Sequence, residues 1–162
     1  MCKHYNDDYI DEIPGDVFTE ALYNVVYTMT GFNVEKKISE EEVEKKPSRD
    51  IVGAMVLAGE KNMVLVVSVN KATASLLVSY MTGMDLTELK EEDLHDGITE
   101  FANMVAGSAK VMLTDTVFSY KLTSPFAVVG ENIGIISKKS VMQYCQTFCA
   151  NEVEIKIQIF SF

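Results

Sequence analysis

The spacing of apolar residues predicts two long helices in this chain. Apolar positions recur three and four residues apart from about Asp16 to Thr30, and again from about Glu91 to Leu113. Asp16 is a candidate N-cap for the first helix, and Gly31 is expected to end it. The second helix would bury one face, made of Leu94, Ile98, Phe101, Ala102, Val105, Ala109, Met112 and Leu113.

Runs rich in β-branched residues predict the strands of a sheet. Residues 51–57 and 63–69 are separated by five residues suited to a hairpin, and both runs are apolar almost throughout. Their apolar character indicates either that both faces of the sheet are covered or that one face pairs with a second subunit. Further strands are expected at 116–129, with an interruption at Ser124-Pro125, at 133–136 and at 152–160.

Three segments complete the predicted organisation. Residues 71–80 indicate a shorter helix that stops near Gly83. The connector at 35–46 is charged and mostly solvated, with room for a short edge strand. Residues 1–13 are polar and acidic, so we expect a loose leader followed by a single domain over 14–162.

The order of these elements suggests a weak internal repeat. Each half runs from a helix to paired strands, and each long helix carries a Thr-Glu pair, at Thr19-Glu20 and at Thr99-Glu100. The next asparagine follows three residues after Glu100 but four after Glu20, and two unrelated amphipathic helices would give the same pattern. We expect an α+β fold: a two-fold pseudo-repeat of helix plus paired strands, giving a mainly antiparallel sheet with long helices packed against it.

Composition and charge narrow the classes of partner. The chain has 162 residues, of which 48% are hydrophobic, which suits one domain with a sizeable core. A net charge of −10 argues against nucleic acid and anionic membrane surfaces as partners. No run approaches the roughly 18 apolar residues of a membrane span, and the N-terminus lacks the apolar core of a signal peptide. We therefore expect a cytoplasmic protein.

Cysteine and histidine offer little catalytic or metal-binding chemistry. Cys145 and Cys149 lie four residues apart on a segment interpreted as helical or connecting, with no histidine nearby. We expect reduced, partly buried thiols rather than a zinc site. Ser-His-Asp catalysis would require His95 as the base, and no serine stands in an activated context. Phosphate-binding loops and metalloprotease motifs are likewise missing from the sequence.

The polar face of the second long helix carries the candidate site. At 3.6 residues per turn, Asp96, Glu100, Asn103 and Gly107 fall within roughly 60° of one another, opposite the apolar face. A carboxylate and a carboxamide three residues apart can together hold a partner's charged group and a water molecule. Gly107 costs about 1 kcal/mol of helix stability relative to alanine, and room for another backbone to approach is a possible compensation. A solvated helix face with a polar mix accounts for the same pattern.

These residues resemble a known family. The spacing Asp96-x3-Glu100-x2-Asn103, with Pro125 at the head of a later strand, is similar to the signature of the CheC/CheX/FliY chemotaxis phosphatases. The segment Asn103-Met-Val-Ala-Gly107 resembles the Asn-Met-x-Ala-Gly of CheX. A single acid–asparagine site in the second half is also the CheX pattern.

The same resemblance covers roughly residues 50–160. Within it, the segment from Leu76 to Met84, which ends in Tyr-Met-Thr-Gly-Met, is similar to the helix and turn before the active-site helix of the family. Ser124 stands where CheX often has the first of two prolines. Neither this departure nor the long leader touches the acid or the amide.

The resemblance implies hydrolysis of the aspartyl-phosphate on CheY, a response-regulator receiver domain. It implies that Asn103 positions the attacking water and that Glu100 pairs with the receiver's lysine. The receiver supplies its own Mg²⁺, so this chain needs no metal or cofactor of its own. Asp96, Met104 and Gly107 would contact the partner or border the docking surface.

The resemblance also implies a homodimer in which the sheet continues across a two-fold interface. Strands 51–57 and 63–69 would leave room for such pairing, and Pro125 would be structural rather than chemical. Two other functions stay open. The chain could be a non-catalytic receiver-binding or adaptor module of a signalling or flagellar complex. It could also be a small-molecule-binding α+β domain, although few polar residues converge on a pocket.

Overall fold

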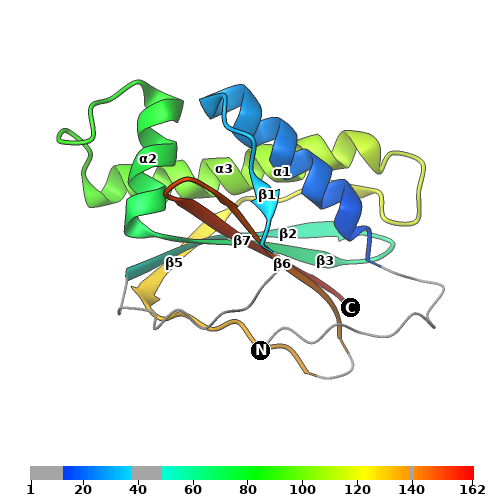
Figure 1. Ribbon diagram of the computed structural model, residues 1–162. Helices are drawn as coiled ribbons and strands as arrows, with labels where there is room; N and C mark the ends of the chain where they lie inside the picture. Colours follow the sequence, from blue (N-terminus) through cyan, green and yellow to red (C-terminus); the bar gives the residue numbers. More distant parts are fainter. Residues whose placement is uncertain (1–12, 38–48, 139–140) are drawn as a thin grey trace.

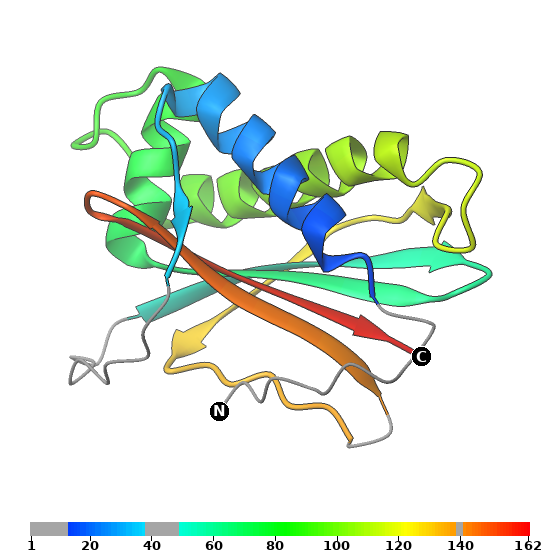
Figure 2. The same cartoon turned by 45° about the vertical axis from the view of Figure 1, so that its right-hand side comes forward.

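The computed structural model describes residues 13–37, 49–138 and 141–162. In these ranges three helices lie on one face of a seven-stranded sheet, as Figures 1 and 2 show. The helices are α1 (Gly15–Thr30), α2 (Lys71–Thr82) and α3 (Glu91–Met112). The strands are β1 (Glu35–Lys36), β2 (Arg49–Gly59), β3 (Met63–Asn70), β4 (Tyr120–Leu122), β5 (Phe126–Glu131), β6 (Met142–Ala150) and β7 (Val153–Ser161). The predicted α+β class is confirmed.

The sheet has a symmetric strand order. It runs β1-β6-β7-β3-β2-β4, and β5 also pairs with β2; all of these pairings are antiparallel. Hairpins β2–β3 and β6–β7 meet at the centre, where β3 pairs with β7. The outer strand of each half pairs with the hairpin of the other half: β1 with β6, and β5 with β2. This arrangement agrees with a pseudo-repeat of helix plus paired strands.

Local sequence signals set the ends of the helices. Gly31 and Gly83 follow α1 and α2 with φ of 73° and 72°, a left-handed conformation that glycine adopts without steric cost. Asp16 is not the N-cap of α1, because the helix begins one residue earlier and the carbonyl of Pro14 accepts the N–H groups of Val17 and Phe18. Asp16 instead lies exposed in the first turn, 3.5 Å from Lys36.

The predicted hairpin and the long terminal strand are confirmed, but two segments were predicted wrongly. Leu57 pairs with Met63 at the end of the β2–β3 hairpin. Residues 133–136 form no strand; they run as irregular chain after β5. The segment with Cys145 and Cys149 is strand β6, which pairs along its length with β7 rather than forming a helix. Cys149 is a free thiol as expected, but Cys145 is disulfide-bonded, so its assignment as a reduced thiol is wrong.

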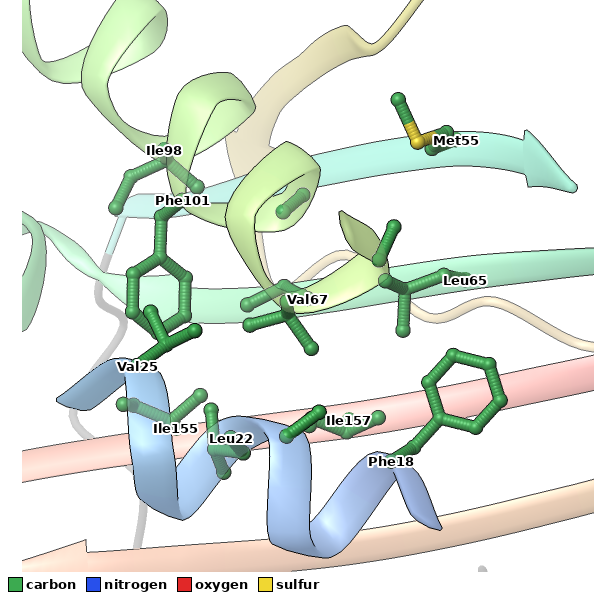
Figure 3. Packing of buried hydrophobic residues seen from close by; sticks show 14 of the residues in the cluster. Phe18, Leu22, Val25, Met55, Leu65, Val67, Ile98, Phe101, Ile155 and Ile157 are labelled. Atoms are coloured by element: carbon green, nitrogen blue, oxygen red, sulfur yellow. The ribbon is translucent and has the colours of Figure 1, made fainter. Parts of the chain in front are cut away.

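The main core lies between the helices and the sheet. Phe18 and Leu22 of α1 and Phe101 of α3 are fully buried against Val67 and Ile157 of the sheet (Figure 3). A smaller buried cluster lies on the opposite face, where Ile133, Ile135 and Val141 pack against it. Its members are Val52, Ala54, Val66 and Phe160. The second face of the apolar strands is therefore covered in part by the chain itself, which is one of the two alternatives that their sequence left open.

Strands β2 and β3 are interior strands, so neither offers an edge to a second subunit. β3 lies between β7 and β2, and β2 lies between β3 and the β4–β5 side. The expectation that these two runs leave room for pairing across a dimer interface is wrong. The edges of the sheet are β1 on one side and β4 with β5 on the other.

Candidate functional site

Helix α3 carries the candidate site on the face turned away from the sheet. Asp93 accepts a hydrogen bond of 2.8 Å from the backbone N–H of Lys90, which closes the first turn. Glu91, Glu92 and Asp93 place negative charge at the N-terminus, where the helix dipole favours it. The helix ends at Met112, within one residue of the predicted boundary.

Two glycines bring the back of α3 close to its neighbours. A Cβ at Gly53 of β2 would lie 2.7 Å from the carbonyl oxygen of Ile98 and 3.2 Å from Cβ of Ala102. A Cβ at Gly97 would overlap the side chain of Val78 in α2. These close approaches fix the distance of α3 from the sheet and from α2, just before the turn that carries Glu100.

Tyr120 contacts α3 on the C-terminal side of Glu100 and Asn103. Its side chain is buried, and its hydroxyl donates a hydrogen bond of 2.7 Å to the carbonyl oxygen of Ala106. Burial raises the pKa of Tyr120 above its ordinary value, so the hydroxyl keeps the proton that it donates. Gly53, Gly97 and Tyr120 were not identified from the sequence as supports of the site. The available signal was a glycine inside an apolar strand, which often marks a close backbone approach.

The predicted acid and amide lie side by side on α3. Glu100 is exposed and Asn103 is partly exposed. Asn103 Nδ2 donates a hydrogen bond to Glu100 Oε2 across 3.4 Å. Because this contact engages the amino end of the amide, the carbonyl oxygen Oδ1 is the end that can accept a hydrogen bond from water. The pair therefore presents a carboxylate and an oriented amide on the solvent face of α3.

The remaining predicted partner residues continue the same face. Asp96 is exposed one turn before Glu100, and its backbone carbonyl accepts the hydroxyl of Thr99. Met104 is partly buried on the flank and packs against the core. Nothing lies within 4 Å of a Cβ built on Gly107, so this position is open for an approaching surface.

Pro125 lies away from α3, in the break between β4 and β5. β4 pairs with residues 57–59 of β2 and β5 pairs with residues 49–54, so the proline stands where the pairing is interrupted. The Thr123 hydroxyl donates to the carbonyl oxygen of Val56 at 2.7 Å and bridges this gap. The position suits a structural role, because proline has no N–H for a strand partner.

The surface hollows of the described residues lie away from the candidate residues of α3. No group of three or more His, Cys, Asp and Glu side chains within them could hold a metal ion. Two open hollows, of about 490 and 300 Å³, are lined by residues other than Asp96, Glu100 and Asn103. None of the helices in the described ranges combines the length and apolar character that crossing a bilayer requires.

Comparison with models of known protein families finds a match to this chain. A model of the chemotaxis phosphatase CheX matches residues 51–149, which include all of α2 and α3. The chain therefore belongs to the CheX family of chemotaxis phosphatases. Among curated proteins, no sequence matches.

Solved structures of chemotaxis proteins share the fold. The Vibrio vulnificus chemotaxis protein CheX is 21% identical, with a TM-score of 0.72, over 91% of this chain and 97% of its own. The Desulfovibrio desulfuricans CheX is 20% identical, with a TM-score of 0.70, over 93% and 100%. The CheX of a CheX–CheY–BeF3–Mg²⁺ complex from Borrelia burgdorferi is 21% identical, with a TM-score of 0.67, over 94% and 99%.

Proposed function

We propose that this protein hydrolyses the aspartyl-phosphate of a CheY-like receiver domain. The observation that carries the proposal is the Glu100–Asn103 pair, held together at 3.4 Å on the solvent face of α3. Membership of a chemotaxis phosphatase family supports the reaction class. The solved complex of a similar protein with CheY supports the partner class.

Asn103 is the group proposed to place the attacking water. Its Oδ1 accepts a hydrogen bond from the water and leaves an oxygen lone pair directed at phosphorus. The water oxygen bonds to phosphorus, the bond to the aspartyl oxygen breaks, and the aspartate leaves as a carboxylate. The water's proton passes to the phosphate or to solvent. Because an acyl phosphate has a good leaving group, positioning supplies what this site must contribute.

Glu100 is proposed to bind the lysine of the receiver and to orient the amide. Its Oε2 already accepts Asn103 Nδ2, so the same carboxylate fixes which end of the amide faces the water. The receiver's lysine would reach a carboxylate that is exposed before docking and excluded from water afterwards. Exclusion of water strengthens such a charge-assisted contact. Mg²⁺ belongs to the receiver in this scheme.

The test is loss of phosphate from a Mg²⁺-bound receiver charged with acetyl phosphate. Wild-type protein should accelerate the loss, and Asn103→Ala should abolish the acceleration while leaving the fold intact. Asn24→Ala is the matched control, because Asn24 is an exposed asparagine of α1 in the other half. Wild-type turnover in Asn103→Ala would overturn the role of Asn103. Binding without acceleration by the wild type would identify an adaptor.

We also propose that the protein is a homodimer joined through the β5 edge. Among the described residues β5 pairs only with β2, and Phe126, Val128 and Val129 are each more than a third exposed. The one charged residue of β5, Glu131, stands at its end, and an apolar edge strand of this kind invites pairing with a second strand. Sedimentation equilibrium should give twice the chain mass, and Val128→Lys should shift it toward the monomer. A monomeric wild type at tens of micromolar would refute this assembly.

A further inference from the structure

Val111 is the one large apolar side chain of α3 that is mainly exposed to solvent. Its exposed fraction is 75%, whereas the other large apolar side chains of the helix are buried or packed partly against the core. An isolated exposed valine is ordinary on a protein surface. What distinguishes Val111 is its position on α3 relative to Glu100 and Asn103.

Val111 stands in line with Glu100. Eleven residues make three turns of an α-helix to within roughly 20°, so the two side chains project in nearly the same direction about 17 Å apart. Gly107 lies between them, and a Cβ there would meet nothing within 4 Å. The exposed face of α3 is thus a continuous stripe that passes from the acid–amide pair across an open notch to an apolar side chain.

A protein partner docked over Asn103 covers enough surface to contact Val111. A specific interface covers about 800 Å² on each partner, equivalent to a disc of about 16 Å radius. Val111 lies only about 12 Å along the helix axis from Asn103. A receiver domain whose phosphorylated pocket is centred on Asn103 therefore covers Val111 as well.

The stripe has a polarity that orients the partner. Glu92 and Asp96 make its N-terminal end acidic, whereas Lys110 and Val111 make its C-terminal end basic and apolar. The lysine of the receiver is attracted to the acidic side at Glu100. The opposite side of the receiver's phosphorylated pocket then meets Val111.

We infer that Val111, together with the notch at Gly107, forms the apolar end of the docking face for the receiver domain. The partner is a receiver that carries an apolar side chain about 10–15 Å from its phosphorylated aspartate, matching the axial offset of Val111 from Asn103. This inference rests on the proposed function. Val111 acts by holding the receiver in register, and it does not touch the reacting atoms.

The experiment compares Val111→Ser and Val111→Asp with matched changes at Leu86. Leu86 is exposed (49%) in the link between α2 and α3, at the other end of the helix. Steady-state hydrolysis of the charged receiver gives kcat and KM for each variant. Isothermal titration with a receiver held in its phosphorylated form by beryllofluoride and Mg²⁺ gives Kd independently of turnover.

Val111→Asp should raise KM and Kd by about tenfold, and Val111→Ser by about threefold to tenfold, with kcat within about twofold of wild type. Leu86→Ser and Leu86→Asp should match the wild type. Unchanged KM and Kd at Val111, an equal rise in Leu86→Asp, or a fall in kcat alone would each overturn the inference.

The two readouts separate this inference from the proposed function. If the wild type does not accelerate hydrolysis, the proposed function fails, and Kd for the beryllofluoride-charged receiver still tests Val111. Weaker binding in Val111→Ser then supports the docking face, and binding as tight as wild type refutes it. An active wild type with an insensitive Val111 refutes the docking face alone.

Discussion

Replacing Gly107 by alanine should stabilise the protein and weaken its reaction with the receiver. Gly107 lies in the interior of α3, where glycine costs about 1 kcal/mol relative to alanine. A Cβ built there meets nothing within 4 Å, so the folded protein loses no packing. The free energy of unfolding should rise by about 1 kcal/mol, and the melting temperature by about 2–4 °C for a chain of this length.

Gly97→Ala is the matched control on the same helix. It gains the same helix propensity, but its Cβ would overlap the side chain of Val78. Overpacking of this kind costs about 1–3 kcal/mol, so the net change should be a loss of stability of up to about 2 kcal/mol. Two Gly→Ala changes ten residues apart should therefore alter stability in opposite directions.

Thermal and urea unfolding followed by circular dichroism measure the stabilities, and hydrolysis of a charged receiver measures function. For Gly107→Ala we expect KM to rise several-fold, because the added methyl group fills the notch where the receiver approaches. Destabilisation by Gly107→Ala would refute the open environment assigned to this position. Stabilisation with unchanged KM would show that the glycine does not serve docking.

Three further predictions follow from other contacts. Glu100→Lys should weaken binding of the charged receiver at least tenfold, since it places a cation against the receiver's lysine; unchanged Kd in titration calorimetry would contradict the pairing. Glu20→Ala should leave turnover within about twofold of wild type, and a large loss in the phosphate-release assay would place a site in the first half as well. Tyr120→Phe should cost about 1 kcal/mol in urea unfolding, because the bond to Ala106 is lost. Since the pKa of Tyr120 is raised in the folded state, unfolding releases a proton above about pH 10, so wild-type stability should fall there more steeply than that of Tyr120→Phe.

Much of the candidate site follows from local periodicity. The 3.6-residue repeat of α3 by itself places Glu100 and Asn103 on one face, opposite buried Ile98 and Phe101. A helix with one strongly apolar face has only one way to lie on a sheet, so its polar stripe must face outward. The glycines that end α1 and α2 and the hairpin between β2 and β3 were equally predictable, because their signals span only a few residues.

Other features required contacts between distant segments. The Cys145–Cys149 segment was interpreted as helical or connecting, and it is strand β6, held between its hairpin partner β7 and β1 from the other end of the chain. Residues 133–136 have strand-like composition, yet after β5 they run as irregular chain, and Ile133 and Ile135 cover the small apolar cluster of the second sheet face. Short apolar runs take whichever structure satisfies their backbone and buries their side chains, so tertiary neighbours decide the outcome.

Local sequence signals account for the helices, the glycines that end α1 and α2, the β2–β3 hairpin and the acid–amide stripe, because each depends on residues close together in the chain. Long-range packing set the strand order, in which the outer strand of each half pairs with the hairpin of the other. It also decided how α3 is held, through Gly53, Gly97 and Tyr120. These arrangements depend on which segments, distant in the chain, have complementary surfaces. The periodicity of one segment shows which of its faces is buried, but it does not specify the segment that packs against that face.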